Sequence, residues 1–231
     1  MCIGAAFVQR VSGFGFGIFI MTVLPYLMPS YGEATTLSGL CALSMSLFIV
    51  IRHRKHIVWS KLWYLLMVFL ITSFFAVHFV SMAADGLLKV FLGIILILAS
   101  LWFLVFAGKV HLKPNKPTQT MLGTLSGIMG GLFGMQGPPA VLYFVETTET
   151  KEEYMAIAQV YFLIGNVMMT GYRAYYGFLT STVLTDYCYG IFGVVLGTVL
   201  GSYAFRHVSL PILRKMIYIY MAVSGIICLW R

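Results

Sequence analysis

Charged residues are scarce in this chain of 231 residues. Only 10% of its residues are charged and only 7 are acidic, whereas soluble domains carry about 25% charged residues. Hydrophobic residues make up 60% of the sequence, and its mean hydropathy is +0.92. The apolar runs continue to both ends of the sequence. The sequence therefore predicts an all-α polytopic membrane protein rather than a soluble domain with a single anchor.

Cysteine clusters, metal-ligand patterns and catalytic sets are missing as well. No CxxC, HExxH or Ser/His/Asp set occurs, so the sequence predicts no metal, no cofactor and no enzymatic activity. The net charge of +8 lies in short loops between apolar runs, where it orients spans in a membrane, so we expect no nucleic-acid partner. The cysteines stand singly in apolar surroundings, as small buried hydrophobic residues do; they are Cys2, Cys41, Cys188 and Cys228.

Charged clusters and turn residues divide the sequence into apolar segments. They cover residues 3–30, 34–51, 58–80, 87–107, 119–145, 154–176, 183–204 and 209–230. Most have the length of about 20 residues that one helical span needs. The first and fifth segments are longer, and a glycine-rich motif interrupts each near its middle, which predicts two half-helices of about 10–13 residues in each.

The two interrupting motifs are SGFGFG, at residues 12–17, and SGIMGGLFGMQGPP, at residues 126–139. Glycine and proline are poor helix formers, and a backbone left without hydrogen bonds is costly in lipid. Irregular backbone therefore persists at membrane depth only where protein or a water-filled cavity satisfies it. A matched pair of such breaks in two halves of one chain indicates a transporter's substrate site.

The order of elements in the first half recurs in the second, which predicts two repeats within one transmembrane domain, residues 1–110 and 117–231. Each repeat begins with a broken helix and continues with three spans. If the broken helices are re-entrant, six spans cross, the basic loops share the cytoplasmic side and the repeats are inverted, as the positive-inside rule favours. The alternative is eight crossing spans with discontinuous helices. The basic loop residues are Arg52, Arg54, Lys55, Lys61, Lys109, Lys113, Lys116, Arg206, Arg214 and Lys215.

The glycine breaks also predict the binding site. A half-helix that ends inside the protein points free N–H groups at a cavity, and together with the helix dipole these suit an anion without a buried base. The alternative is that the glycines only allow close helix packing. The expected substrate-binding residues of the breaks are Gln9, Ser12, Gly13, Gly15, Gly17, Gly134, Gln136, Gly137 and Pro138.

A polar stripe marks the sixth segment. Its members lie on one helical face, which we expect to point at protein or water rather than lipid; they are Gln159, Asn166, Thr170 and Arg173. Gln159 and Asn166 join the expected substrate-binding set. We assign gating or anion attraction to Arg173 and to Arg10 beside the first break, with snorkelling to the interface as the alternative for Arg173. The acidic run of residues 146–153 fits a helix N-terminus or a cation-coupling role.

At these motifs the chain resembles the TauE/SafE family, also called the 4-toluenesulfonate uptake permease family. The residues that carry the resemblance are FVQRVSGFGFG, at 7–17, and LSGIMGGLFGMQGPP, at 125–139, and the likeness covers essentially the whole chain. Family members often carry glycines where this chain has Met135 and Gln136, and glycine is common at the position of Arg10. The resemblance implies transport of small sulfur-containing anions such as sulfite, sulfoacetate or related sulfonates.

The functional expectation is a secondary transporter that binds its anion between the broken helices and works by alternating access. It would lie in the cell membrane, most readily a bacterial plasma membrane. Its partners would be the anion, membrane lipid and a coupling proton or cation, and the sequence sets no oligomeric state. The alternatives are a membrane-embedded enzyme or thiol carrier of sulfur metabolism and a non-transporting scaffold.

Overall fold

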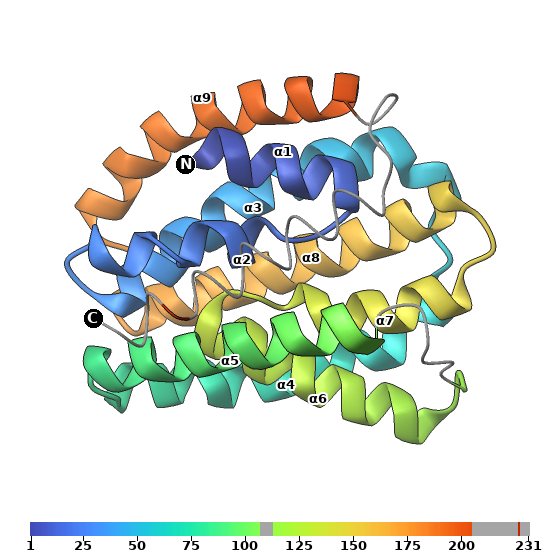
Figure 1. Ribbon diagram of the computed structural model, residues 1–231, viewed down its shortest axis with the longest axis horizontal. Helices are drawn as coiled ribbons and strands as arrows, with labels where there is room; N and C mark the ends of the chain where they lie inside the picture. Colours follow the sequence, from blue (N-terminus) through green and yellow to red (C-terminus); the bar gives the residue numbers. More distant parts are fainter. Residues whose placement is uncertain (107–112, 205–225, 227–231) are drawn as a thin grey trace.

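The computed structural model describes residues 1–106, 113–204 and 226, and every regular element in that part is helical (Figure 1). The expected all-α fold is confirmed for these residues. The last expected segment, residues 209–230, lies outside the described residues apart from Ile226. The α-helices are α1 (Cys2–Ser12), α2 (Phe16–Met21), α3 (Tyr31–His53), α4 (Trp59–Met82), α5 (Asp85–Phe106), α6 (Lys116–Phe133), α7 (Gly137–Thr147), α8 (Lys151–Tyr175) and α9 (Ser181–Ala204).

Four of the described helical stretches are long and apolar enough to cross a membrane. They are Tyr31–His56, Trp59–Met82, Glu152–Tyr175 and Ser181–Tyr203, which correspond to the second, third, sixth and seventh predicted segments. Short 3₁₀ turns at Leu24–Tyr26 and Arg54–His56 connect the helices around α3.

Side-chain caps start four of the described helices; at α9, Thr180 accepts a hydrogen bond from the N–H of Val183 at 3.3 Å. Ser30 accepts a hydrogen bond from the N–H of Glu33 at 3.2 Å, and Thr150 accepts one from the N–H of Glu153 at 3.2 Å; Asn115 caps α6 in the same way. Glu153 also forms an ion pair of 2.7 Å with Lys61 at the start of α4. A carboxylate in the first turn of a helix interacts favourably with the helix dipole. Glu153 therefore stabilises the start of α8 and also holds α8 beside α4.

Both glycine motifs interrupt helical structure. α1 ends at Ser12, and Gly13 and Gly15 then take φ values of 85° and 107°, a left-handed conformation that glycine adopts without strain. α6 ends at Phe133, and Gly134 follows with φ 67°.

Two of the half-helices, α1 and α7, have 11 residues each and match the expected 10–13, whereas α2 and α6 do not. α2 has only 6 residues, and a 3₁₀ turn that begins at Leu24 follows it, with Pro25 at its second position, where the missing N–H costs little. α6 has 18 residues, because it starts at the Asn115 cap rather than inside the apolar run.

Each break turns the chain back on itself. In the first, Phe19 near the end of α2 lies against Gly4 near the start of α1, where an added Cβ would be 2.9 Å from the ring. In the second, Gln119 near the start of α6 donates a hydrogen bond of 2.8 Å to the hydroxyl of Tyr143 in α7. α1 and α2 therefore run antiparallel, as do α6 and α7, and both pairs are helical hairpins (Figure 1).

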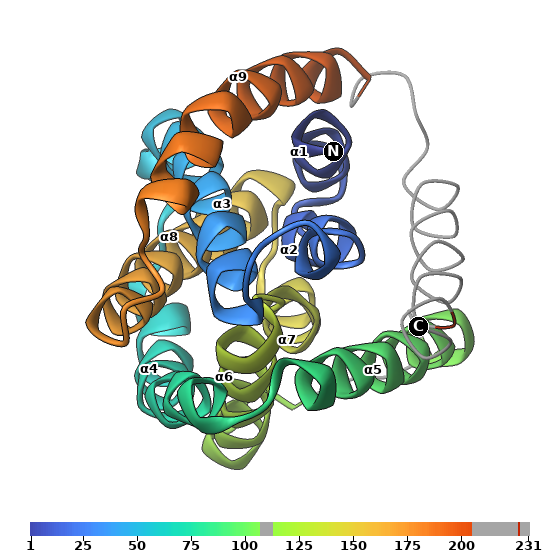
Figure 2. The same ribbon diagram turned by 90° about the vertical axis from the view of Figure 1, so that its left-hand side faces the viewer.

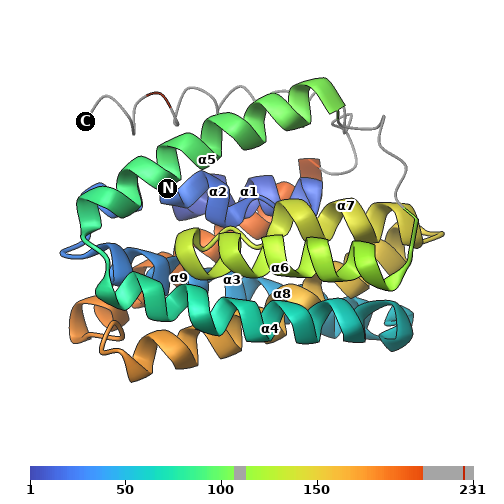
Figure 3. The same ribbon diagram turned by 90° about the horizontal axis from the view of Figure 1, so that it is seen from below.

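Small residues allow the two closest helix pairs to form. α1 packs on α9 and α6 packs on α4, while α3 and α8 lie against each other between them (Figures 2 and 3). A Cβ at Gly127 of α6 would lie 2.7 Å from the Cβ of Thr72 in α4. Glycines four residues apart give such close approach in membrane proteins; the facing sets are Gly123, Gly127 and Gly131 of α6, and Gly193, Gly197 and Gly201 of α9.

Candidate functional site

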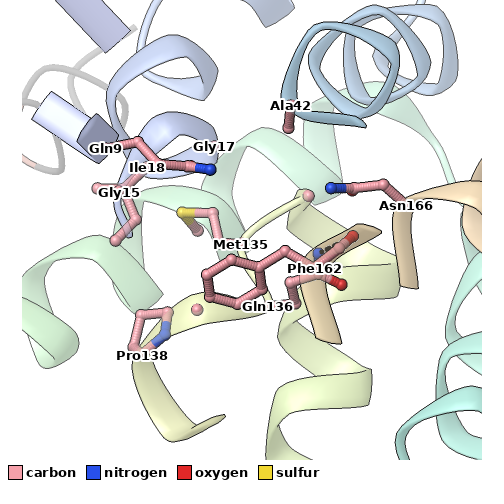
Figure 4. Close-up of a pocket in the computed structure, with 12 residues that line it drawn as sticks. Gln9, Gly15, Gly17, Ile18, Ala42, Met135, Gln136, Pro138, Phe162 and Asn166 are labelled. Atoms are coloured by element: carbon pink, nitrogen blue, oxygen red, sulfur yellow. Dashed lines mark hydrogen bonds between the residues drawn. The ribbon is translucent and has the colours of Figure 1, made fainter. Parts of the chain in front are cut away.

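A small cavity lies where the two hairpins meet. It leaves about 20 Å³ for the centres of water-sized atoms, which is room for one or two water molecules. Figure 4 shows its walls, with the side chain of Asn166 reaching in from α8. Its lining residues are Gln9, Gly15, Gly17, Ile18, Ala42, Gly134, Met135, Gln136, Gly137, Pro138, Phe162 and Asn166.

Most of the expected substrate-binding residues line this cavity. The exceptions are Ser12, Gly13 and Gln159, which lie beside it, while Arg10 and Arg173 lie outside its lining. Sequence reasoning missed four lining residues whose apolar side chains carry no signal in an apolar segment: Ile18, Ala42, Met135 and Phe162.

The two breaks touch each other at this cavity. A Cβ added to Gly17 would collide with the carbonyl oxygen of Gly134, so only glycine fits there. A Cβ on Gly137 would lie 3.3 Å from that of Phe14, so the second break also packs on the first. The cavity wall is thus formed by backbone from both halves of the chain.

Glutamine side chains hold the first break in place. Gln9 accepts a hydrogen bond of 3.2 Å from the N–H of Phe16, the first residue of α2, and donates one of 3.4 Å to Gln159. Gln159 in turn donates to the carbonyl of Gly13 at 2.9 Å and accepts from Ser46 at 3.0 Å. This network ties the hairpin to α3 and α8, so Gln159 positions the break rather than lining the cavity.

Ser12 and Ser126 satisfy the turns themselves. The hydroxyl of Ser12 lies 2.8 Å from the carbonyl of Val8 and 2.5 Å from that of Phe14. Ser126 donates to the carbonyl of Gln136 at 2.5 Å and accepts from the hydroxyl of Tyr161 at 2.7 Å. Sequence reasoning missed Tyr161, because an aromatic residue in an apolar helix gives no polar pattern. Ser12, expected to bind substrate, instead closes its own turn.

Several N–H groups at the cavity have no hydrogen-bond partner among the described residues. They belong to Gly15, Gly17 and Ile18 in the first hairpin and to Gln136 and Gly137 in the second. The first N–H groups of a helix have no partner inside that helix, and Pro138 and Pro139 carry none. The oxygen of the Gln136 side chain is also buried without a partner, although its nitrogen donates to the carbonyl of Phe162 at 3.3 Å.

Arg173 is fully buried, so the snorkelling alternative is wrong. Its guanidinium donates to the carbonyl of Thr35 in α3 at 3.0 Å and to those of Gly130 and Gly131 in α6 at 3.0 and 3.2 Å. The last carbonyls of a helix lack partners, and a positive charge suits that end of the dipole. Arg173 therefore caps α6 from α8 and anchors it to α3.

The polar stripe of α8 leads from Arg173 to the cavity. A Cβ on Gly39 of α3 would have Arg173 Nη1, Thr170 Oγ1 and Asn166 Oδ1 within 4 Å. These three polar groups thus gather at one point, and Asn166 also lines the cavity. Within the described part of the chain, no carboxylate pairs with the guanidinium.

Arg10 lies at the other side of the first hairpin. Its Nε donates to the hydroxyl of Ser202 in α9 at 2.8 Å, and its stem packs against Gly201. It lies within electrostatic reach of Arg52 and His53 at the end of α3. Arg10 is thus part of a basic cluster near the α3–α4 loop rather than a wall of the cavity.

Comparison with known proteins supports the earlier resemblance. The family model described as sulfite exporter TauE/SafE matches residues 1–227. The chain belongs to the TauE/SafE family. It is therefore a member of a family of membrane transporters, and both hairpins fall within the matched range of that TauE/SafE model.

The TauE/SafE relatives include a curated protein of Cupriavidus necator named probable sulfite/organosulfonate exporter TauE. The two sequences are 23% identical over 197 residues, which cover 84% of this chain and 77% of that protein. No solved structure matches the chain.

Proposed function

We propose that this protein is a secondary transporter that carries a small sulfur oxyanion or organosulfonate across the cell membrane. The observation that carries the proposal is the group of unpartnered N–H groups at the cavity between the two hairpins. Such groups at a helix N-terminus, with the helix dipole behind them, form an anion site. The names of the family and of its curated relative are the grounds for proposing a sulfur-containing substrate.

The proposed anion lies against the N–H groups of Gln136 and Gly137 at the start of α7, opposite the backbone of Gly15 and Gly17. Asn166 offers an amide donor from α8. No lining residue is charged, so no carboxylate repels the anion there. The buried charge of Arg173, which the polar stripe connects to Asn166, adds a favourable potential for a negative substrate.

The size of the cavity favours the smallest members of the substrate class. Space for one or two waters suits a compact oxyanion such as sulfite better than an organosulfonate with an apolar tail. A larger substrate requires the hairpins to move apart. We therefore place sulfite first and larger sulfonates second in affinity.

Two re-entrant hairpins fit the geometry better than eight crossing spans. Lys61, at the start of α4, pairs with Glu153 at the start of α8, which supports a chain that enters and leaves α6–α7 on the same side. A hairpin helix of 11 residues, such as α1 or α7, is about 16 Å long, roughly half of the hydrocarbon core of about 30 Å.

The helix packing supports inverted halves with boundaries near 1–110 and 117–231. α1 packs on α9 as α6 packs on α4, α3 touches α9 as α8 touches α4, and α3 and α8 pack on each other. An exchange of the two halves preserves all these pairs. Alternating access would then be a rocking of one half against the other, driven by a proton or cation gradient.

Transport from liposomes tests the proposal. We expect purified protein to release trapped labelled sulfite, and Gly137→Leu to abolish release by filling the cavity. Gly171→Leu is the matched control, because nothing lies within 4 Å of a Cβ there, and it should release sulfite normally. No release of any sulfur oxyanion or sulfonate by folded wild-type protein would contradict the proposal, and unchanged release by Gly137→Leu would move the site elsewhere.

A further inference from the structure

Two cysteines that stand far apart in the sequence meet in the fold. Cys2 lies at the start of α1 and Cys41 in the middle of α3. Helix α9 packs on both of these helices (Figure 2). A Cβ on Gly190 of α9 would lie 3.1 Å from the sulfur of Cys41 and 3.4 Å from that of Cys2. Both sulfurs therefore lie within 4 Å of one point, so two cysteines that stand singly in the sequence are neighbours in the fold.

Glycines in α9 make room for this pair. A Cβ on Gly193 would lie 2.9 Å from the Cβ of Cys2, so α9 approaches α1 closely at the same level. Cys41 is fully buried and Cys2 is partly exposed, whereas Cys188 is exposed. One thiol of the pair is therefore open to a reagent while its neighbour is shielded.

We propose that Cys2 and Cys41 form a redox-active dithiol that closes to a disulfide. With a low-molecular-weight disulfide as the oxidant, the Cys2 thiolate attacks one of its sulfurs and releases one thiol. Cys41 then attacks Cys2 in the mixed disulfide, which releases the second thiol. One protein disulfide forms, one reagent disulfide is reduced to two thiols, and each cysteine loses its proton.

The bond would restrict the first hairpin. Gln9 of α1 and Ala42, the neighbour of Cys41 in α3, both line the cavity. A covalent link between α1 and α3 fixes these two walls relative to each other. This consequence rests on the proposed transport function, because it assumes that the hairpin moves against α3 during transport. Formation of the disulfide does not depend on that assumption.

Oxidation of the purified full-length protein tests the pair. The protein is treated with glutathione disulfide, remaining free thiols are alkylated, and linked peptides are mapped by mass spectrometry. We expect a peptide pair joining residues 2 and 41 in the wild type and in Cys188→Ser, and none in Cys2→Ser. Cys2 and Cys41 both remaining alkylated while Cys188 becomes a mixed disulfide would overturn the proposal.

A trivalent arsenical probes the same proximity without oxidation. Phenylarsine oxide bridges two neighbouring thiols, so we expect it to protect Cys2 and Cys41 together from alkylation in the wild type. In Cys41→Ser, Cys2 should lose this protection. Alkylation of both cysteines in the presence of the arsenical would contradict the proposal that the two thiols are close enough to react with each other.

Sulfite release before and after oxidation tests the consequence. We expect the disulfide form to lose most of its transport and to recover it on reduction, while Cys2→Ser stays active in both conditions. Full transport by the disulfide form would show that a covalent link between α1 and α3 does not restrict transport. Absence of transport in the reduced protein would instead contradict the proposed function. Peptide mapping would still show whether Cys2 and Cys41 form a disulfide.

Discussion

At the scale of single residues, three of the buried polar atoms without hydrogen-bond partners lie at the cavity or on the polar stripe beside it. The buried Gln136 Oε1, Thr170 Oγ1 and Arg173 Nε have no hydrogen-bond partner among the described residues. An unsatisfied buried polar group costs about 1–3 kcal/mol, so a site that only packed helices would gain from losing them. Gln136 lines the cavity itself, so it is the most informative of these three side chains to change.

Replacing Gln136 by a carboxylate tests the sign of the substrate charge. We expect Gln136→Glu to abolish sulfite release, because the new carboxylate repels an anion at the adjacent N–H groups, while Gln136→Met retains partial release. Release from liposomes and binding by thermal shift are the two measurements. Gln119→Glu adds the same charge at the start of α6, away from the cavity, and should leave release intact. A Gln136→Glu protein that transports at the wild-type rate would mean that no anion passes this point.

At the scale of elements, both hairpins depend on side chains that lie elsewhere in the sequence. Gln159 of α8 holds the first turn through the carbonyl of Gly13, and Arg173 of the same helix holds the end of α6. α8 therefore organises both breaks from one polar stripe. An isolated half-helix has little stability of its own, because short helices are only marginally stable without tertiary contacts.

Arg173 gives the prediction at this scale. Arg173→Met removes the donors to carbonyls in both α3 and α6, and we expect it to lower stability by at least about 2 kcal/mol. Arg173→Lys should fall between this variant and the wild type, because a single ammonium restores the charge but not the fork that bridges two helices. Thermal unfolding in detergent and the KM for sulfite would be measured together.

The lysine variant separates the two roles of Arg173. If it restores transport and stability fully, charge alone matters and the cap on α6 does not. If Arg173→Met unfolds at the wild-type temperature, the cap contributes nothing to the fold.

The sequence predicted the positions of the breaks but not what surrounds them. Glycine and proline in an apolar segment have a local physical meaning, so residues 13–17 and 134–138 were found from the sequence alone. Ala42 and Phe162 reach the cavity only through packing of α3 and α8, which no local pattern encodes. For Arg173 the sequence could not distinguish snorkelling from capping, because its partners lie about 40 and 140 residues away along the chain.

At the scale of the whole molecule, the two helix pairs α1–α9 and α4–α6 flank a central pair, α3–α8. The first pair joins the beginning and the end of the described chain, so the two halves interlock rather than fold side by side. In the transport mechanism that we propose, such halves would expose a shared cavity to one side or the other by moving against each other. The repeat and its inversion remain predictions, and the sidedness of the loops decides them.

Sidedness is tested by cysteine labelling in intact cells, in a background without native cysteines. Two re-entrant hairpins predict that Lys55→Cys and Glu149→Cys react only from the cytoplasmic side, because Lys61 and Glu153 next to them form an ion pair. Ala84→Cys and Thr180→Cys should react with a membrane-impermeant maleimide from outside, since His78 and Tyr176 at the ends of α4 and α8 are hydrogen-bonded at 2.8 Å. Eight crossing spans would instead place Glu149→Cys outside with Ala84→Cys, and that labelling pattern would rule out a re-entrant second hairpin.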